Sequence, residues 1–375
     1  MNSPKTTLLL NLETFNNQGG VQRVSRVLAK ALSTQTTLVV HSLYDGPGQV
    51  DLRYVPSTHF HAYSGNKFRF FLKALAGSLR AETVVLSHIN LLLLALAMKL
   101  FNPRLKVILL AHGVEVWRPL SNWKRSFIKQ HIQTWAVSQF TAKRLEMQIG
   151  RSRHPIRVLN NCLDPFFRIP HQLSRPKYLE EKYQLKADAR VLFCLSRLSS
   201  YDAEKGYDKL LYALPALLQK HPNITYLLAG QATQLEQSRL KDLIITQGLE
   251  DHVILAGPIS EEELTDHYLL ADVFVLCSTK EGFGLALIEA AACGSPIICG
   301  NVDGSIDAVL NGQMATLINP HHIGQLEKAV LHFFKQDNNN LGQQQKCLQH
   351  FGYEAYVQKL GDLLGSKPIN SRQYA

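Results

Sequence analysis

Short runs of Leu, Ile and Val alternate along the chain with longer stretches in which apolar residues recur every three or four positions. Such runs are typical of strands buried on both faces of a parallel sheet, and the stretches between them are typical of covering helices. The pattern therefore predicts an α/β fold. In the first half, strands are predicted at Thr6–Leu12, Thr37–His41, Thr83–Leu86, Lys106–Leu110, Thr134–Val137 and Ile156–Leu159.

A polar, proline-containing stretch, Asp164–Pro176, interrupts this rhythm, which then restarts. In the second half, strands are predicted at Ala189–Leu195, Thr225–Ala229, Val253–Leu255, Val273–Leu276 and Pro296–Cys299. The 375 residues are enough for two domains of ordinary size. We therefore expect two Rossmann-like domains, at residues 1–168 and 169–349, followed by a helix at about 350–365.

The composition is that of a globular protein, with 46% hydrophobic and 19% charged residues. The six cysteines have no CxxC spacing, so we expect reduced, mostly buried thiols of a cytoplasmic protein. The longest apolar run, Leu91–Met98, is far shorter than the ~20 residues that span a bilayer. The apolar start of the chain is too short for a signal peptide and is predicted to be a strand.

Positive charge is concentrated in the first half of the chain. Residues 1–168 contain 22 Lys and Arg against 7 Asp and Glu, and residues 169–375 contain 18 against 23, giving +15 and −5. Such asymmetry indicates an anionic partner for the first half, either nucleic acid or an anionic lipid surface. No nucleic-acid motif accompanies the charge, so a membrane surface is favoured.

The most specific segment is EGFGLALIE, from Glu281 to Glu289, followed by AAACGSPIICG. A helix is predicted to begin near Gly284 and to stop at Gly294. Glu281 lies in the loop before it, within reach of a sugar hydroxyl, and Glu289 lies inside the helix, where it can accept from ribose hydroxyls. The alternative is a solvated loop Glu and an ordinary helix Glu. The start of the helix offers free N–H groups for a phosphate at Phe283, Gly284 and Leu285.

Two cations follow the first strand of the second half. Arg197 and Lys205 lie in SRLSSYDAEKGYD, before a helix predicted at Tyr207–Lys220. Cations at the carboxyl end of a parallel strand suit a diphosphate, because Arg binds two oxygens at once and Lys adds a compact charge. The alternative for Lys205 is a solvated loop lysine.

The first half carries weaker candidates. Gly19 and Gly20 form a strand-to-helix turn whose amides can face a phosphate or an acceptor, although any Rossmann-like turn can carry glycines. His112 follows the fourth predicted strand, at the sheet edge where open α/β proteins bind ligands. Taken alone, such a histidine is more often structural.

The Glu-x7-Glu element with its FG and the following ACG-x-P-I resembles the signature of the retaining GT-B glycosyltransferases of family 4, also described as glycosyl transferases group 1. The resemblance implies two Rossmann-like domains facing each other across a cleft, with the last helix packed back on the first domain. It assigns Glu281 to the donor sugar, Glu289 to the ribose, Arg197 and Lys205 to the leaving diphosphate, and His112 to the donor sugar and acceptor. The resemblance also implies that the turn at Gly19 and Gly20 faces the interdomain cleft, which favours a substrate-binding role for it.

The loop from Gly300 to Gly312, GNVDGSIDAVLNG, is similar to a variant seen among exopolysaccharide mannosyltransferase-like members. It places Asp303 and Asp307 at another strand-to-helix junction. A helix cap at Ser305 or Asp307 is the simpler interpretation.

The function that the resemblance implies is transfer of a hexose, with retention, from a nucleotide-diphosphate sugar to a glycan or lipid-linked acceptor in polysaccharide or glycolipid synthesis. GDP-mannose is the first donor to consider, and a UDP-sugar is the second. We predict turnover without a cofactor or metal, because the sequence lacks a supporting set of hard oxygen ligands around an Asp-x-Asp element. The partners expected are the sugar donor and the acceptor, with no nucleic acid.

Two basic, aromatic stretches, Asn66–Arg80 and Asn122–Trp135, either lie in a membrane interface or pack on the first domain. With the +15 half, they favour a peripheral enzyme on the inner face of the cell membrane. A competing NAD-dependent oxidoreductase needs a GxGxxG turn, and GGVQRV does not supply one. A non-catalytic nucleotide-sugar or nucleic-acid binding protein with a GT-B-like fold is the other alternative.

Overall fold

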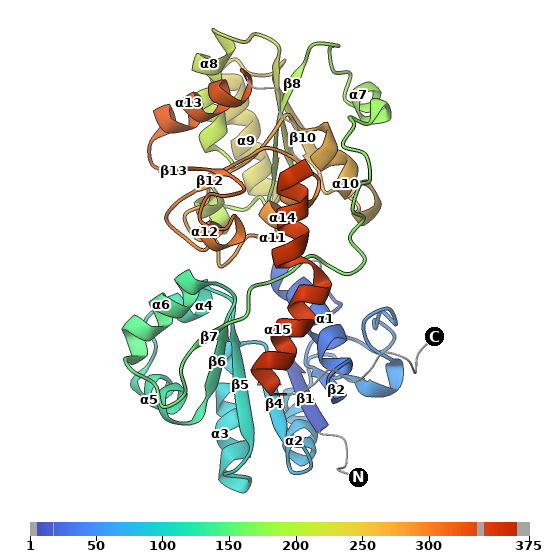
Figure 1. Cartoon of the computed structure of the whole chain (residues 1–375), viewed down its shortest axis with the longest axis vertical. Coiled ribbons are helices and arrows are strands. Elements are labelled where there is room, and N and C mark those ends of the chain that lie inside the picture. Colours follow the sequence, from blue (N-terminus) through green and yellow to red (C-terminus); the bar gives the residue numbers. More distant parts are fainter. Residues whose placement is uncertain (1–5, 18, 336–340, 366–375) are drawn as a thin grey trace. The chain divides into compact units, whose positions relative to one another are not determined.

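The computed structural model describes residues 6–17, 19–335 and 341–365, apart from the side chains of residues 201–203 (Figure 1). The chain divides into two compact units, one formed by Met1–Pro165 with Tyr353–Ala375 and the other by Phe166–Gly352. Each unit is built around its own parallel sheet.

The first unit has a seven-stranded parallel sheet with the order β3-β2-β1-β4-β5-β6-β7. Strand order reverses between β1 and β4, which pair with Leu8 opposite Val84. This reversal is the topological switch point at which open α/β sheets bind ligands. The strands are β1 (Thr6–Asn11), β2 (Thr37–Ser42), β3 (Phe60–Ala62), β4 (Thr83–Leu86), β5 (Lys106–Ala111), β6 (Gln133–Ala136) and β7 (Arg157–Val158).

Helices cover both faces of this sheet. From β1 the chain moves to β2 on one side of the sheet, whereas from β4 it moves through β5 and β6 to β7 on the other side. Because each crossover is right-handed, the helices of these two sets of connections lie on opposite faces of the sheet. One face carries α1 (Gly20–Ser33), against which α15 (Tyr353–Leu364) packs. The other face carries α2 (Lys67–Ser78), α3 (Leu92–Phe101), α5 (Asn122–His131) and α6 (Gln139–Ile149), whose apolar residues share one core with Leu8, Leu10, Val84 and Leu86. Shorter helices are η1 (Ser57–His59), η2 (Ile89–Leu91) and α4 (Val114–Trp117).

The second unit has a six-stranded parallel sheet with the order β10-β9-β8-β11-β12-β13, so its switch point lies between β8 and β11. The strands are β8 (Arg190–Leu195), β9 (Ile224–Ala229), β10 (Val253–Gly257), β11 (Val273–Leu276), β12 (Ile297–Gly300) and β13 (Thr316–Ile318). The helices are α7 (Lys177–Lys182), η3 (Ser200–Lys205), α8 (Lys209–Leu218), α9 (Gln234–Thr246), α10 (Glu261–Leu270), α11 (Leu285–Ala292), α12 (Ser305–Ala308), α13 (Ile323–Phe333) and α14 (Leu341–Phe351).

The eleven predicted strands are all present, within a few residues at their ends. One boundary differs from the prediction. The last helix starts at Tyr353, after a break at Gly352, and the residues before the break belong to α14. The basic, aromatic stretch Asn122–Trp135 consists of α5 and the beginning of β6, where Trp135 is buried. All six cysteines are buried and unpaired, as predicted.

Candidate functional site

The loops that follow β8 and β11 come together at the switch point of the second unit. Gly206 makes this approach possible, because a Cβ atom there would lie 2.1 Å from the carbonyl oxygen of Cys277. Its φ of +69° also favours glycine. The chain after β8 is thereby held against the carboxyl end of β11.

The SSYDAE insert before Lys205 forms the 3-10 helix η3, and its last turn is tied to the loop after β11. The carbonyl oxygen of Glu204 accepts hydrogen bonds from the N–H of Thr279 at 2.8 Å and from Ser278 Oγ at 3.2 Å. The Glu204 carboxylate pairs with Lys280. These contacts fix the position of Lys205, the next residue.

Lys205 and Glu281, the predicted diphosphate and sugar residues, form an ion pair through Nζ and Oε1. Their side chains are 25% and 16% exposed, so the pair is partly withdrawn from water. An ammonium group has three N–H donors, and therefore Lys205 can keep Glu281 while it binds an anion.

The backbone beside this pair offers a row of N–H donors. Gly284 caps α11 with a φ of +95°, which favours glycine. Within the described part of the chain, no acceptor takes the N–H groups of Gly282, Phe283, Gly284 or Leu285. The Phe283 ring is buried against Phe351, with centroids 5.5 Å apart, so this residue can serve a ligand only through its backbone. Free amides at the positive end of a helix suit a phosphate.

A buried carboxylate holds this loop in place. The oxygens of Asp303 accept the N–H of Glu281 at 2.6 Å and the N–H of Ser305 at 3.0 Å, and Asp303 is 0% exposed. The N–H of Gly304 donates to the carbonyl oxygen of Glu281 at 2.8 Å. Burial raises the pKa of Asp303 to about 6. The sequence indicates a helix cap at Ser305 or Asp307, but the sequence reasoning missed that Asp303 holds the Glu281 loop in place.

Three further residues lie around the same loops. Glu289 is 3% exposed, and its Oε2 accepts a hydrogen bond from the Tyr268 hydroxyl at 2.8 Å. Arg197 is exposed just after β8. Lys209, which the sequence reasoning missed, donates from Nζ to the Cys277 carbonyl oxygen at 3.1 Å, and burial lowers its pKa. The signal that could have identified it is a second lysine only four residues after Lys205, at the start of the predicted helix.

In the first unit, His112 lies just beyond β5 and is 9% exposed. Its Nε2 lies 2.9 Å from the Ser87 carbonyl oxygen beyond β4. Because a carbonyl only accepts, Nε2 carries the proton and Nδ1 has a free electron pair in the neutral ring. Burial lowers the pKa of His112, against the opposing effect of Glu115. Glu115 in turn accepts the N–H of His112 at 2.6 Å.

The loop after β1 is also braced by a buried carboxylate that the sequence reasoning missed. Asp45 is 0% exposed and accepts the N–H groups of Thr14, Phe15 and Asn16 at 2.7 to 3.0 Å. Asp45 occurs in YDGPG, which indicates a turn and nothing more. The loop leads to Gly19, the N-cap of α1, and to Gly20, its exposed first residue.

The described residues contain no group of three or more His, Cys, Asp or Glu side chains able to hold a metal ion. Metal-independent turnover stays a prediction. None of the described helices is long and apolar enough to cross a bilayer.

Two family descriptions match the chain. Residues 18–166 match Glycosyltransferase Family 4, and residues 177–350 match Glycosyl transferases group 1. Together the two matches account for most of both units.

Curated relatives are similar mainly over half of the chain. A GDP-mannose-dependent alpha-(1-6)-phosphatidylinositol monomannoside mannosyltransferase of Mycolicibacterium smegmatis is 32% identical over 201 residues, which are 52% of this chain and 50% of the relative. A glycogen synthase of Mycobacterium tuberculosis is 37% identical over 179 residues, 47% of this chain and 39% of the relative. The matches thus span about half or less of these two relatives.

Solved structures share the fold over nearly the whole chain. HepE of Anabaena, crystallised with UDP and glucose, has a TM-score of 0.78 at 20% identity and covers 96% of this chain and 99% of its own. Sucrose-phosphate synthase of Thermosynechococcus elongatus has a TM-score of 0.72 at 18% identity, with 96% and 98% covered. At these identities the likeness concerns the fold.

Proposed function

We propose, from the premise that this chain belongs to the GT-B glycosyltransferases of family 4, that it transfers a hexose from a nucleotide-diphosphate sugar to a glycan or lipid-linked acceptor, with retention of anomeric configuration. The products belong to polysaccharide or glycolipid synthesis. GDP-mannose is the donor we favour, since it is in the name of the mannosyltransferase relative, and a UDP-sugar is the second choice.

The observation that carries this proposal is the pairing of Lys205 with Glu281 beside the row of free amides at the start of α11. The amides and the ammonium supply positive charge for a diphosphate, and the carboxylate supplies an acceptor for sugar hydroxyls. Both charges lie at the switch point of the sheet, where α/β proteins bind nucleotides. We assign the ribose to Glu289 and a second diphosphate contact to Arg197.

In the proposed reaction, the bond between the anomeric carbon and the diphosphate oxygen breaks through an oxocarbenium-like state. The acceptor hydroxyl attacks from the face that the diphosphate leaves, and its proton passes to the departing phosphate oxygen. Negative charge therefore grows on the diphosphate, and Lys205, Arg197 and the α11 amides would stabilise it. We assign no metal to this task.

In the first unit, we propose that His112 contacts the donor sugar and acceptor, and that Gly19 and Gly20 line the acceptor side. A neutral His112 with its Nδ1 electron pair can accept from a sugar hydroxyl. The brace between Nε2 and Ser87 would hold the ring in that orientation.

We also propose that the first unit binds an anionic membrane surface through α2 and α3, which pack against each other. The exposed large apolar side chains of these helices are Phe68, Leu72, Leu93, Leu100 and Phe101, and Leu79 just after α2 is exposed too; Phe68 and Leu100 are each 74% exposed. Lys67, Arg69 and Lys73 are exposed on the same helix as Phe68, and neither helix contains Asp or Glu. Exposed apolar and cationic side chains together are typical of a helix that lies in a membrane interface.

Thermal unfolding with a panel of nucleotide sugars tests the donor. A donor at about 100 times its Kd stabilises the folded protein by ~2.7 kcal/mol, which raises Tm by about 5 °C or more. We expect GDP-mannose to give the largest rise and mannose alone to give none. Lys205→Ala should reduce the rise, and Lys220→Ala, an exposed lysine just beyond the other end of α8, should leave it intact.

Release of nucleoside diphosphate and formation of a glycosylated product must accompany binding. A chain that binds a donor but transfers no sugar to any glycan or lipid-linked acceptor would instead be a binding protein. Activity that is lost with a chelator and restored by Mg²⁺ would contradict the metal-independent mechanism.

A further inference from the structure

A cavity lies at the amino ends of strands in the first unit, whereas His112 lies beyond the carboxyl end of β5. Its volume is about 290 Å³, and it is bounded by the beginnings of β5, β6 and β7 and by the end of α15. Lys106, Gln133 and Arg157 are the first residues of these three strands. His112 and Gly19 lie beyond the carboxyl ends of strands, so this cavity is separate from the proposed acceptor side.

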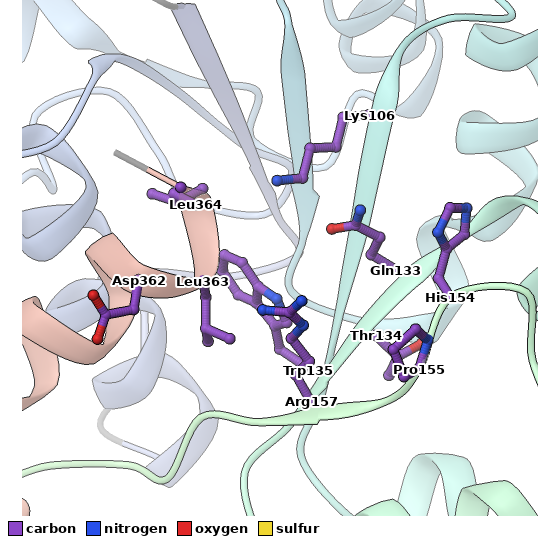
Figure 2. Close-up of a pocket in the computed structure, with 11 residues that line it drawn as sticks. Lys106, Gln133, Thr134, Trp135, His154, Pro155, Arg157, Asp362, Leu363 and Leu364 are labelled. Carbon is purple, nitrogen blue, oxygen red and sulfur yellow. The ribbon is translucent and has the colours of Figure 1, made fainter. Parts of the chain in front are cut away.

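The cavity combines polar and apolar walls. Figure 2 shows Lys106 and Gln133 pointing from their strands toward the end of α15, where Leu363 and Leu364 lie. The Trp135 side chain, 1% exposed, forms another part of the lining. Asp362 also lines the cavity, and its carboxylate points away from Lys106 and Gln133 (Figure 2).

The segments that run from the ends of α3, α5 and α6 into these strands are strongly cationic. Residues 99–106, 129–135 and 150–157 contain seven Lys or Arg and no Asp or Glu. Burial lowers the pKa of His154, and the nearby Arg153, Lys99 and His131 lower it further. Cationic side chains gathered at the amino ends of neighbouring strands attract an anionic ligand.

We propose that this cavity binds a small phosphate ester, with the phosphate at Lys106 and Arg157 and the carbon part against Trp135, Leu363 and Leu364. Arg and Lys together provide charge-assisted hydrogen bonds to phosphate oxygens. Gln133 adds an amide donor. A volume of about 290 Å³ is at the small end of ligand pockets, so the occupant is smaller than a nucleotide sugar. The phosphate comes either from a free metabolite or from the headgroup of a lipid.

NMR of the tryptophan indole N–H groups of the full chain, titrated with sn-glycerol 3-phosphate, tests the site. The chain has three tryptophans, and Trp135→Phe identifies the signal of the cavity residue. We expect the Trp135 signal to shift in a saturable manner while those of Trp117 and Trp123 stay in place. Added salt should weaken the binding, because screening weakens exposed charge pairs.

The variant K106Q/R157Q should bind the ester at least about tenfold more weakly. The control K143Q/R144Q removes the same charge from exposed positions of α6, which covers the opposite face of the sheet from α15. It should bind like the wild type. Equal binding by all three proteins, or an equal loss in both variants, would overturn the proposal. Unchanged Tm values confirm that the variants are folded.

Vesicles distinguish the two sources of phosphate. If the occupant is a lipid headgroup, phosphatidylglycerol vesicles should shift the Trp135 signal, phosphatidylcholine vesicles should not, and K106Q/R157Q should abolish the shift. If the occupant is a free phosphate ester, sn-glycerol 3-phosphate should shift the Trp135 signal and neither kind of vesicle should shift it. A Trp135 signal that responds to neither probe contradicts the proposal. Donor binding to the second unit is unaffected in every case, so this test is independent of the proposed transferase site.

Discussion

Two buried aspartates act in the same way in the two units. Asp303 accepts the N–H of Glu281 beyond β11, and Asp45 accepts three successive N–H groups beyond β1. An ionised carboxylate accepts several hydrogen bonds, and these bonds offset the cost of its burial. Each candidate loop is thus braced by one side chain that comes from another loop of its own unit.

For Asp303 we predict a positioning role. Asp303→Asn keeps the size, but its amide group must face one of the two N–H donors, so the bond to Glu281 or the bond to Ser305 is lost. An unsatisfied buried donor costs ~1–3 kcal/mol, and the Glu281 loop should loosen. We expect the KM for the donor to rise about tenfold or more while the fold persists at 25 °C.

Steady-state kinetics against donor concentration checks this prediction, with Asp307→Asn as the control. Asp307 lies on the short helix α12, which begins two residues after Asp303, but it makes no hydrogen bond to the N–H of Glu281. Asp303→Asn with wild-type KM and kcat would show that Asp303 only supports the fold.

For Lys205 we predict a catalytic role in stabilising the departing diphosphate. Removing one such electrostatic donor typically costs ~2.7–4 kcal/mol of transition-state stabilisation. Lys205→Ala should therefore lower kcat/KM about 100- to 1,000-fold, with Lys220→Ala near the wild type. Lys205→Arg should restore part of the loss, because it keeps the charge. A loss of less than about fivefold for Lys205→Ala would place the diphosphate elsewhere.

The elements that carry strong periodic signals were predictable, and two of the short edge strands, β3 and β13, were not. β3 and β13 have three residues each, lie at the sheet edges, and carry too few apolar positions to give a pattern. The Lys205 and Glu281 pair could be expected as a cluster, because both follow strands of one parallel sheet. The bracing by Asp303 and Asp45 could not, since it depends on which N–H groups a loop turns toward a side chain.

For the loops after β8 and β11, we predict that Gly206→Ala lowers the free energy of unfolding by more than its backbone angle alone explains. Gly206 and Gly248 have similar φ values, +69° and +64°. A Cβ at Gly206 meets the Cys277 carbonyl at 2.1 Å, whereas a Cβ at Gly248 has no atom within 4 Å. Gly248→Ala therefore measures the cost of the left-handed conformation, ~1–2 kcal/mol.

Gly206→Ala should cost more than Gly248→Ala in urea unfolding and should also reduce activity, because the clash displaces Lys205. Gly248→Ala should remain fully active. Equal destabilisation and equal activity of the two variants would mean that the approach of Gly206 to Cys277 does not position the site.

For α2 we predict a loss of membrane binding when its exposed apolar residues become polar. The double variant F68S/L72S removes two side chains that are 74% and 47% exposed, so it should leave stability nearly unchanged. Each such residue contributes roughly 1.5–3 kcal/mol when it is buried in an apolar medium. Sedimentation with phosphatidylglycerol vesicles at low salt should show at least a tenfold weaker association. The control L235S, an exposed leucine of α9, should bind as the wild type.

Across the whole molecule, burial lowers the pKa of several histidines, His41, His61, His88, His112, His154 and His267 among them. A lowered pKa means that the unfolded chain takes up a proton at a higher pH than the folded protein does. Stability therefore falls on acidification below the unfolded pKa, near 6.5. Asp303 acts in the opposite direction, because its pKa is raised to about 6.

His41 gives the sharpest prediction of this acid sensitivity. Burial, aided by His61 and Lys73, lowers its pKa to about 3, and its Nδ1 is hydrogen-bonded to the Tyr63 hydroxyl. Between pH 6.5 and about 3, the unfolded state binds one proton at this site and the folded state binds none. The site should therefore remove ~1.4 kcal/mol of stability for each pH unit of acidification.

Urea unfolding of the wild type and of His41→Gln at pH 7, 6, 5 and 4.5 measures this slope, with signals assigned to the first unit. Glutamine keeps a hydrogen-bonding group for Tyr63 but does not titrate. The variant is expected to be less stable than the wild type at pH 7, where the native packing is intact, and the difference should shrink by ~1.4 kcal/mol per pH unit below 6.5. The other histidines are common to both proteins and cancel in the comparison. If the free energies of unfolding of the two proteins change in parallel with pH, His41 takes up its proton in the folded state as readily as in the unfolded state. The buried contact with Tyr63 would then have to accommodate a charge.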